Sequence, residues 1–261
     1  MTEQDRFPAT YEGLRQLVER LRGPDGCPWD REQTADSLKR VFLEECYELI
    51  EAIEQDDSRK TAEELGDVLF NLVFQIKIGI EGEAFSEEQV FGAVIEKLVR
   101  RHPHVFGDVR VADSTEVKAN WDQIKRSERT DDDASILDGV PKTMPALSYA
   151  QAVQDRAART GFDWEDAGGV IDKLVEEVRE LRAAGSPAEI ESEFGDVVFS
   201  LVNAARWMGV EAEEALRHAN ARFFRRFAAM ERLSRQDGVS LSELPLDRKE
   251  ELWQRSKKLV G

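Results

Sequence analysis

The chain has 261 residues, of which 41% are hydrophobic and 34% are charged, and its formal net charge is −17. This length fits one large domain or two modest ones. So acidic a chain is a poor match for nucleic acid, whose binding depends on neutralising phosphate charge. No apolar run approaches the ~18 residues that a membrane-spanning helix requires. Because the first six residues are polar and acidic, we expect no signal peptide and a cytoplasmic protein that contacts no membrane.

Apolar residues recur mostly at intervals of three and four along the whole chain, which predicts an all-α protein. In chain order, the predicted helices span residues 11–22, 38–55, 60–80, 86–101 and 114–129, and then 147–160, 168–184, 187–208, 212–235 and 246–259. Between the two sets lies a charged, proline-marked stretch. We therefore predict two domains, 1–129 and 146–261, joined by a linker over 130–145.

Landmarks in the first half of the chain return in the same order in the second half. E-E-x-x-E at 44–48 returns at 176–180, E-x-x-D at 64–67 returns at 193–196, and Trp121 with Lys125 returns as Trp253 with Lys257. The offsets are 132, 129 and 132 residues. So nearly constant an offset predicts two copies of one module.

The acidic motifs of the first module lie on apolar helices. On a helical wheel Glu45 falls within the apolar stripe of its helix, and Glu44 and Glu48 lie at the edge of that stripe. The next helix is apolar around most of its circumference, which predicts that it is buried, and it leaves a narrow polar strip with Glu64 and Asp67. Because an ionised carboxylate facing a core is costly without a compensating cation, we expect these acids to bind a metal ion.

In the second module Glu193 and Asp196 form a similar strip, but the wheel places Glu176, Glu177 and Glu180 beside the apolar stripe rather than within it. If the two acidic helices of a module pack antiparallel, their carboxylates can converge. Such hard oxygen ligands suit Mg²⁺, with Mn²⁺ as a substitute, whereas three histidines offer little for zinc. The alternative is a solvated acidic face, and the repetition of both motifs favours the metal.

These motifs resemble the mark of the MazG family of nucleoside triphosphate pyrophosphohydrolases, in which E-E-x-x-E is followed by E-x-x-D. The segments 26–30, 42–45, 63–67 and 100–106 add to the resemblance, which covers nearly the whole chain as two tandem modules. It implies an all-α fold of two tandem bundles of four to five helices each. It also implies a homodimer that converts nucleoside triphosphates and water to monophosphates and diphosphate, using carboxylate-bound Mg²⁺ and an activated water. The tandem family often keeps its chemistry in one module, and we expect the second.

The resemblance also implies a role for individual residues. The implied metal ligands are Glu44, Glu45, Glu48, Glu64 and Asp67, and then Glu176, Glu177, Glu180, Glu193 and Asp196. Within this set the expected catalytic residues are Glu45, Glu177, Glu180, Glu193 and Asp196. The expected substrate contacts are Lys97, Arg100, Arg101, Trp121 and Lys125, and then Asn203, Asn220, Arg222, Arg225, Arg226, Trp253 and Lys257. Arg222 stands where we would expect a lysine.

Two other readings of the sequence stay open. One is a specialised hydrolase of the same superfamily that acts on a single nucleotide such as dUTP, dCTP or phosphoribosyl-ATP. The other is a helical interaction protein without catalytic activity, whose acidic patches are solvated or bind a partner. The sequence leaves open which module is active and which glutamate is the general base.

Overall fold

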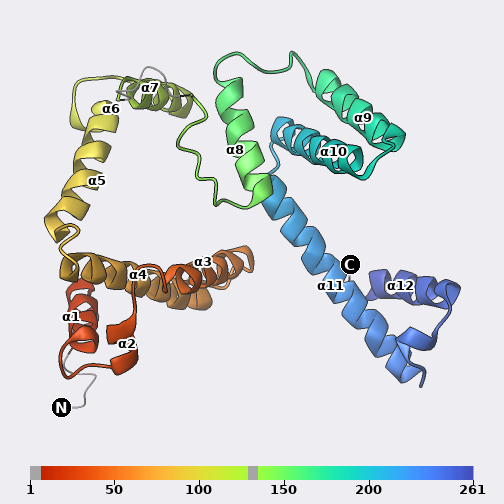
Figure 1. The fold of residues 1–261 in the computed structure, drawn as a ribbon, viewed down its shortest axis with the longest axis horizontal. Coiled ribbons are helices and arrows are strands. Elements are labelled where there is room, and N and C mark those ends of the chain that lie inside the picture. Colours follow the sequence, from red (N-terminus) through yellow and green to blue (C-terminus); the bar gives the residue numbers. More distant parts are fainter. Residues whose placement is uncertain (1–6, 129–134, 261) are drawn as a thin grey trace. The chain divides into compact units, whose positions relative to one another are not determined.

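The structure is a computed structural model that describes residues 7–128 and 135–260 (Figure 1). All regular secondary structure in these ranges is helical, which confirms the predicted all-α class. No helix of the described ranges is long and apolar enough to cross a membrane. The chain divides into two compact units, unit 1 (Met1–Thr130) and unit 2 (Asp131–Gly261), which we describe separately.

Unit 1 is built around a hairpin of two long helices, α3 and α4. Its helices are α1 (Tyr11–Arg22), α2 (Pro28–Glu32), α3 (Lys39–Glu54), α4 (Ser58–Glu81), α5 (Glu87–Arg101), α6 (Pro103–Phe106) and α7 (Ser114–Ser127). The side chain of Asp57 caps α4 by accepting hydrogen bonds from the backbone N–H groups of Arg59 and Lys60. The helix therefore begins sharply after a short turn, and α4 packs back along α3.

The core of unit 1 lies between α1 and α4. Val18 of α1 and Phe74 of α4 are almost fully buried, together with Leu38 and Val73. Burying four such side chains stabilises this junction by roughly 1.5–3 kcal/mol each. The α3–α4 hairpin is thereby held on α1.

Unit 2 contains a second helical hairpin, formed by α9 and α10. Its helices are α8 (Ala146–Ala158), α9 (Ala167–Ala183), α10 (Pro187–Trp207), α11 (Ala212–Gln236), a 3₁₀ turn (Leu241–Glu243) and α12 (Leu246–Val260). Ser186 and Glu189 form a capping box at the start of α10, and Pro187 occupies its first turn. These residues stop α9 and start α10 within a three-residue connection, so the two helices pack side by side.

The long helix α11 joins two parts of unit 2. At its start, Gln151 of α8 donates to the carbonyl of Val210 and accepts from the N–H of Ala212. Near its end, Met230 and Leu233 pack against Leu252 of α12 in a second buried cluster. Figure 1 accordingly shows α12 beside the C-terminal part of α11, while α8 and α10 contact its N-terminal part.

All ten predicted helices occur, with ends displaced by at most two residues where the structure describes them. The end of the helix predicted over 114–129 and the linker residues 130–134 lie outside the described residues. The short elements α2, α6 and the 3₁₀ turn were not predicted, because a single turn carries too little periodicity to be recognised. Part of the predicted linker is folded: Arg156 donates to the carbonyls of Asp138 and Gly139, and Val140 is buried.

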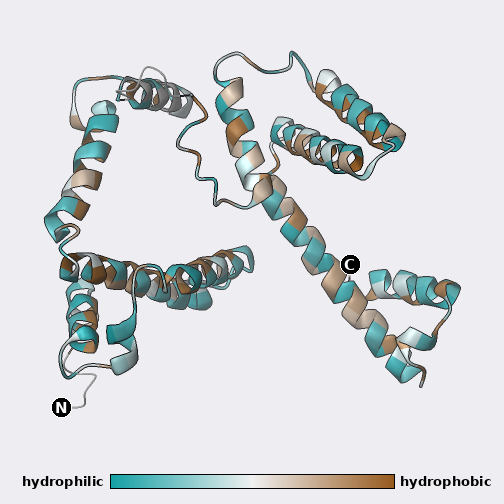
Figure 2. Cartoon of the chain, in the orientation of Figure 1, coloured by the Kyte–Doolittle hydropathy of each residue, from teal (hydrophilic) through white to brown (hydrophobic). Residues whose placement is uncertain are grey.

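One expectation about burial is wrong for the single chain. We expected α4 and α10 to be buried around most of their circumference. However, Leu65 and Leu72 of α4 are exposed, as are Phe194 and Leu201 of α10. Hydrophobic residues recur along both helices (Figure 2), and one chain covers only part of them.

Candidate functional site

The α3–α4 hairpin brings three carboxylates together. Glu45 and Glu48 lie one turn apart on α3, and Glu64 reaches them from α4, so that one oxygen of each lies within 4.8 Å of the others. We call these three residues the first triad. Glu64 is only 5% exposed, although no Lys or Arg of the described residues forms an ion pair with it. Its position confirms that this acid points into the protein.

Burial and mutual repulsion raise the pKa values of the first triad. Burial raises the pKa of Glu45 above its usual range, and the nearby charges of Asp67 and Glu48 raise it further. The pKa of Glu64 is raised by burial first and then by Glu48. Carboxyl groups in such a place gain from any cation that neutralises them.

The α9–α10 hairpin repeats this arrangement in unit 2. Glu177 and Glu180 of α9 and Glu193 of α10 also present oxygens within 4.8 Å of one another, and we call them the second triad. Burial raises the pKa of Glu193, followed by the charges of Glu180 and Asp196. Two hairpins far apart in sequence thus build the same carboxylate geometry.

Glu177 corrects the helical-wheel prediction. The wheel placed it beside the apolar stripe of its helix, yet it is only 6% exposed. The wheel counts the apolar residues of α9 alone, whereas α10 packs against the side of α9 that carries this carboxylate. The burial of Glu177 depends on a neighbouring helix that a single-helix projection does not contain.

Lys173 distinguishes the second triad from the first. Its ammonium group lies 2.7 Å from a carboxylate oxygen of Glu176 and 2.7 Å from one of Glu177, and these carboxylates raise the pKa of the lysine. The residue at the matching offset in unit 1 is Val41. Sequence reasoning missed Lys173, although its spacing of three and four residues from the two glutamates was a visible signal.

The remaining predicted ligands lie next to the triads rather than within them. Glu44 is exposed and accepts a hydrogen bond from Arg40 at 2.9 Å, and Glu176 is engaged by Lys173. Asp67 and Asp196 are exposed, but their charges act on Glu45 and Glu193. The structure therefore gathers three of the five predicted ligands of each module into one group.

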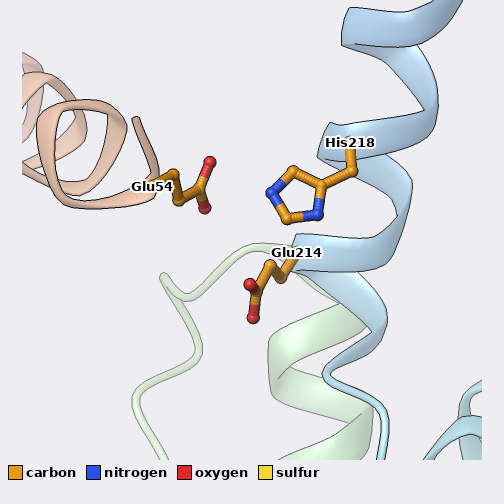
Figure 3. Close-up of side chains that lie close together, drawn as sticks. All are labelled: Glu54, Glu214 and His218. Atoms are coloured by element: carbon orange, nitrogen blue, oxygen red, sulfur yellow. The ribbon is translucent and has the colours of Figure 1, made fainter. Parts of the chain in front are cut away.

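The chemistry of both triads fits a hard divalent cation. Each triad offers carboxylate oxygens and neither thiolate nor imidazole, which is the donor set that Mg²⁺ and Mn²⁺ prefer. His218 lies one turn from Glu214 on α11 (Figure 3), and two such side chains are too few for a zinc site. Glu54 in the same view belongs to unit 1.

The predicted substrate contacts of unit 1 gather where α5 meets α7. The guanidinium of Arg101 lies over the ring of Trp121 at 5.5 Å, and His102 packs edge-on against the same ring at 4.8 Å. Both Arg100 and Arg101 are bonded to Glu128, a residue that sequence reasoning missed. Lys97 of α5 and Lys125 of α7, on the same two helices, are exposed.

In unit 2 the predicted contacts lie on α11 and α12. The ammonium of Lys257 lies over the ring of Trp253 at 5.7 Å, and Trp253 packs against Phe223 at 5.5 Å. The other members of the predicted set on α11 are partly buried or exposed side chains, namely Asn220, Arg222, Arg225 and Arg226. Of this set, the structure brings Lys257 and Trp253 together, beside Phe223 of α11.

Asn203 is engaged in a structural network instead. Its side-chain oxygen accepts a hydrogen bond from Arg206 at 3.0 Å, and Arg206 also forms an ion pair with Asp163. Trp207 donates to the same aspartate at 2.9 Å. Asp163 therefore has a packing role, because it fixes the loop before α9 to the end of α10.

Within one unit, acids and cations occupy different helix pairs. In unit 2 the acids lie on the α9–α10 hairpin, which contacts the start of α11, whereas Trp253 and Lys257 lie on α12, beside the end of α11 (Figure 1). In unit 1 the acids lie on α3 and α4, and Trp121 lies on α7, which packs on α5. The structure thus brings three predicted ligands of each module together, on helices other than those that carry the Arg101–Trp121 and Lys257–Trp253 pairs.

The chain resembles known proteins over almost its entire length. A family model described as the MazG nucleotide pyrophosphohydrolase domain matches residues 33–106. The nucleoside triphosphate pyrophosphohydrolase/pyrophosphatase MazG of Thermotoga maritima is 45% identical over 247 residues, which cover 95% of both chains. This chain belongs to the MazG family. The nucleoside triphosphate pyrophosphohydrolase of Escherichia coli K12 is 42% identical over 252 residues, or 94% of this chain and 96% of that one.

A further relative is longer than this chain. The uncharacterized protein YabN of Bacillus subtilis is 44% identical over 251 residues, which cover 95% of this chain but 51% of that protein. The family model matches a segment that begins before α3 and ends with α6, and this segment contains the whole first triad. Membership of the MazG family therefore confirms the resemblance that the acidic motifs indicated.

Proposed function

We propose that this MazG protein is a nucleoside triphosphate pyrophosphohydrolase that converts a nucleoside triphosphate and water to a monophosphate and diphosphate. The observation that carries the proposal is the carboxylate triad, which is built twice across a helical hairpin at the sites of the E-E-x-x-E and E-x-x-D motifs. The names of the Thermotoga and Escherichia relatives support the same activity.

The triads would hold Mg²⁺, with Mn²⁺ as a substitute. In unit 2 the ligands would come from Glu177, Glu180 and Glu193, with Glu176 and Asp196 beside them, and in unit 1 from Glu45, Glu48 and Glu64, with Glu44 and Asp67 beside them. A bound divalent ion neutralises phosphate charge and lowers the pKa of water. A carboxylate whose pKa is already raised is suited to take up the proton of the attacking water, and Glu45 and Glu193 meet this condition.

The cationic residues would bind and orient the substrate. Guanidinium groups such as those of Arg222 and Arg225 match the geometry of phosphate oxygens, and the rings of Trp121 and Trp253 offer flat surfaces for a base. We assign Lys97, Arg101, Lys125, Asn220, Arg226 and Lys257 to the same task. Asn203 would act by holding Arg206 rather than by contacting the nucleotide.

We further propose a homodimer in which a second chain covers the exposed apolar faces. Residues 91–100 of α5 are all exposed in the single chain, and they include Val94, Ile95 and Leu98. On α11, Phe223 and Phe224 are likewise exposed. Such contiguous apolar surface is unusual for a monomer, and an isologous pair of hairpins would complete helical bundles. The partner could also bring its cations near the acids of the first chain.

A pyrophosphate-release assay tests the activity. Each nucleoside triphosphate is incubated with the full chain and Mg²⁺. A broad MazG hydrolase releases diphosphate from several of them, whereas a specialist for one nucleotide gives a single strong signal. Release from none, by protein whose helical content is intact, would leave only an interaction protein.

Two charge-removing variants locate the active module. Glu177→Gln and Glu45→Gln each remove one triad charge at nearly unchanged volume. We expect Glu177→Gln to abolish release and Glu45→Gln to leave most of it, because we assign catalysis to the second module. Glu191→Gln, an exposed acid on α10 outside the triad, is the matched control and should retain full activity.

A further inference from the structure

Each triad contains one buried carboxylate, and the two carboxylates differ in their partners. Glu64 of the first triad is 5% exposed and forms no ion pair with any Lys or Arg of the described residues. Glu177 of the second triad is 6% exposed, and the ammonium group of Lys173 lies 2.7 Å from one of its oxygens. An ionised carboxylate in such a place is costly unless a cation compensates its charge. In unit 2 that cation is part of the chain, whereas the described residues of unit 1 supply none by an ion pair.

Lys173 occupies the second triad from within its own helix. It lies three and four residues before Glu176 and Glu177, a spacing that places the three side chains on one side of α9. Its ammonium group lies 2.7 Å from an oxygen of each, and the side chains of Lys173 and Glu177 are 36% and 8% exposed. A divalent ion at this triad would bring two more positive charges to a carboxylate that already has a cation. The ion must therefore displace the ammonium group or bind against its repulsion.

The first triad is not occupied in this way. The position of α3 that matches Lys173 is Val41, a half-buried apolar residue one turn before the acids. Lys60 of α4 acts on Glu64 through its charge alone: burial and then Glu48 raise the pKa of Glu64, and Lys60 lowers it less than these raise it. A metal ion can therefore approach the buried carboxylate of the first triad without breaking an ion pair of the described residues.

We propose that Lys173 holds the place of a metal ion in the second triad, so that the first triad binds a free divalent ion more tightly than the second does. This inference rests on the proposed function, because that function assigns a divalent ion to both triads. In the first triad the ion compensates a buried carboxylate that has no other paired cation. In the second it replaces a bound cation, and only the difference between the two remains as binding free energy. The triads therefore fill in order as the metal concentration rises.

Metal binding to the nucleotide-free full chain tests the order of filling. Mn²⁺ is titrated into the protein, and the free ion is followed by electron paramagnetic resonance, which reports binding without turnover. We expect two classes of site whose dissociation constants differ about fivefold, the effect of one partly buried ion pair. Glu64→Gln should remove the tighter class, and Glu193→Gln the weaker one. Glu191→Gln, an exposed acid of α10 outside the triad, is the control and should keep both.

Substitutions at the two matching positions test the role of the lysine. Lys173→Met removes the charge at similar length and should tighten the weaker class about fivefold, whereas Lys173→Arg keeps the charge and should change it less than twofold. Val41→Lys gives the first triad the lysine of the second and should weaken the tighter class about fivefold. Arg182→Gln removes a charge from an exposed position of α9 and should leave both classes within twofold of the wild-type values.

The outcomes separate this inference from the function on which it rests. If the wild-type protein binds no divalent ion and hydrolyses no triphosphate, the proposed function fails. If it binds metal and hydrolyses triphosphates, but both triads bind Mn²⁺ equally tightly, the order of filling is wrong. If a folded Lys173→Met protein binds the weaker class no tighter than Arg182→Gln does, the lysine does not hold the place of the metal. Circular dichroism establishes that each variant is folded, and Lys173→Met at its partly exposed position decides the question if Val41→Lys does not fold.

Discussion

Replacing Glu45 by Gln should stabilise the metal-free protein and weaken its response to Mg²⁺. The carboxylate of Glu45 lies within 4.8 Å of those of Glu48 and Glu64, and burial together with these neighbours raises its pKa. At about 5 Å and an effective dielectric constant near 20, each such pair repels by roughly 3 kcal/mol. Glu48 is exposed, so solvent screens much of this repulsion. We therefore expect the charge of Glu45 to lower the free energy of unfolding of the metal-free protein by ~1 kcal/mol.

The same raised pKa sets the pH range of this effect. A carboxyl group whose folded-state pKa is raised favours the folded state only while it is protonated, and this contribution is lost as pH rises through the folded-state value. The stability gap between Glu45→Gln and the wild-type protein should therefore open above the ordinary value of 4.5. At pH 8 we expect the metal-free variant to unfold about 3 °C higher than the wild-type protein.

Thermal unfolding followed by circular dichroism, with EDTA or with 10 mM Mg²⁺, measures both effects. Mg²⁺ should raise the Tm of the wild-type protein through binding to the folded state and raise that of the variant less. Glu51→Gln, an exposed acid on the same helix outside the triad, is the control and should behave as the wild-type protein does. The reasoning fails if metal-free Glu45→Gln is less stable than the wild-type protein, or if its Mg²⁺ response is undiminished.

Three other measurements follow from the same contacts. The Mg²⁺-induced rise in Tm should shrink between pH 8 and pH 5, because the raised pKa values of Glu45, Glu64 and Glu193 favour their protonated forms at the lower pH; an equal rise at both values would contradict a carboxylate site. Asp163→Asn should cost ~1 kcal/mol of stability in denaturant titrations at pH 7, because it breaks the ion pair with Arg206, whose partners are only partly buried. Since the pKa of Asp163 is lowered to about 2, this contribution is present above about 4 and lost as pH falls through 2, so the variant and the wild-type protein should converge in acid. Lys173→Met should lower metal-free stability by leaving Glu177 buried without its cation, and should enlarge the Mg²⁺-induced rise in Tm; a smaller rise would show that the lysine aids metal binding instead.

The helices and the inward position of Glu64 could be predicted from sequence, because both depend on local periodicity. When a helix is apolar around most of its circumference, it packs against other elements on most sides, and a carboxylate on it then faces one of them. The burial of Glu177 could not be predicted in this way, since it depends on how α10 approaches α9. The contacts of Glu128 were hidden for a similar reason, because its partners lie on another helix and 27 or 28 residues away in sequence.

The exposed apolar faces show a different limit of sequence reasoning. The hydrophobic pattern of α4 and α10 indicates how much of each helix is covered in the functional protein. It does not indicate whether the same chain or a second chain covers it. Leu72 and Phe194 are therefore expected inside from the sequence, but both are exposed in the single chain. Their exposure is the structural reason to expect a second copy, since they lie on the helices that carry the acids.

Each unit has a built-in ion pair at its candidate site. In unit 2 the acids are engaged by a cation of the same helix, Lys173. In unit 1 the position matching Lys173 is Val41, and it is the arginine pair that is engaged, by Glu128. A metal ion that binds the second triad must release the ion pair between Lys173 and Glu177, whereas no ion pair among the described residues involves the first triad. The second triad should therefore need a higher Mg²⁺ concentration than the first for half-saturation.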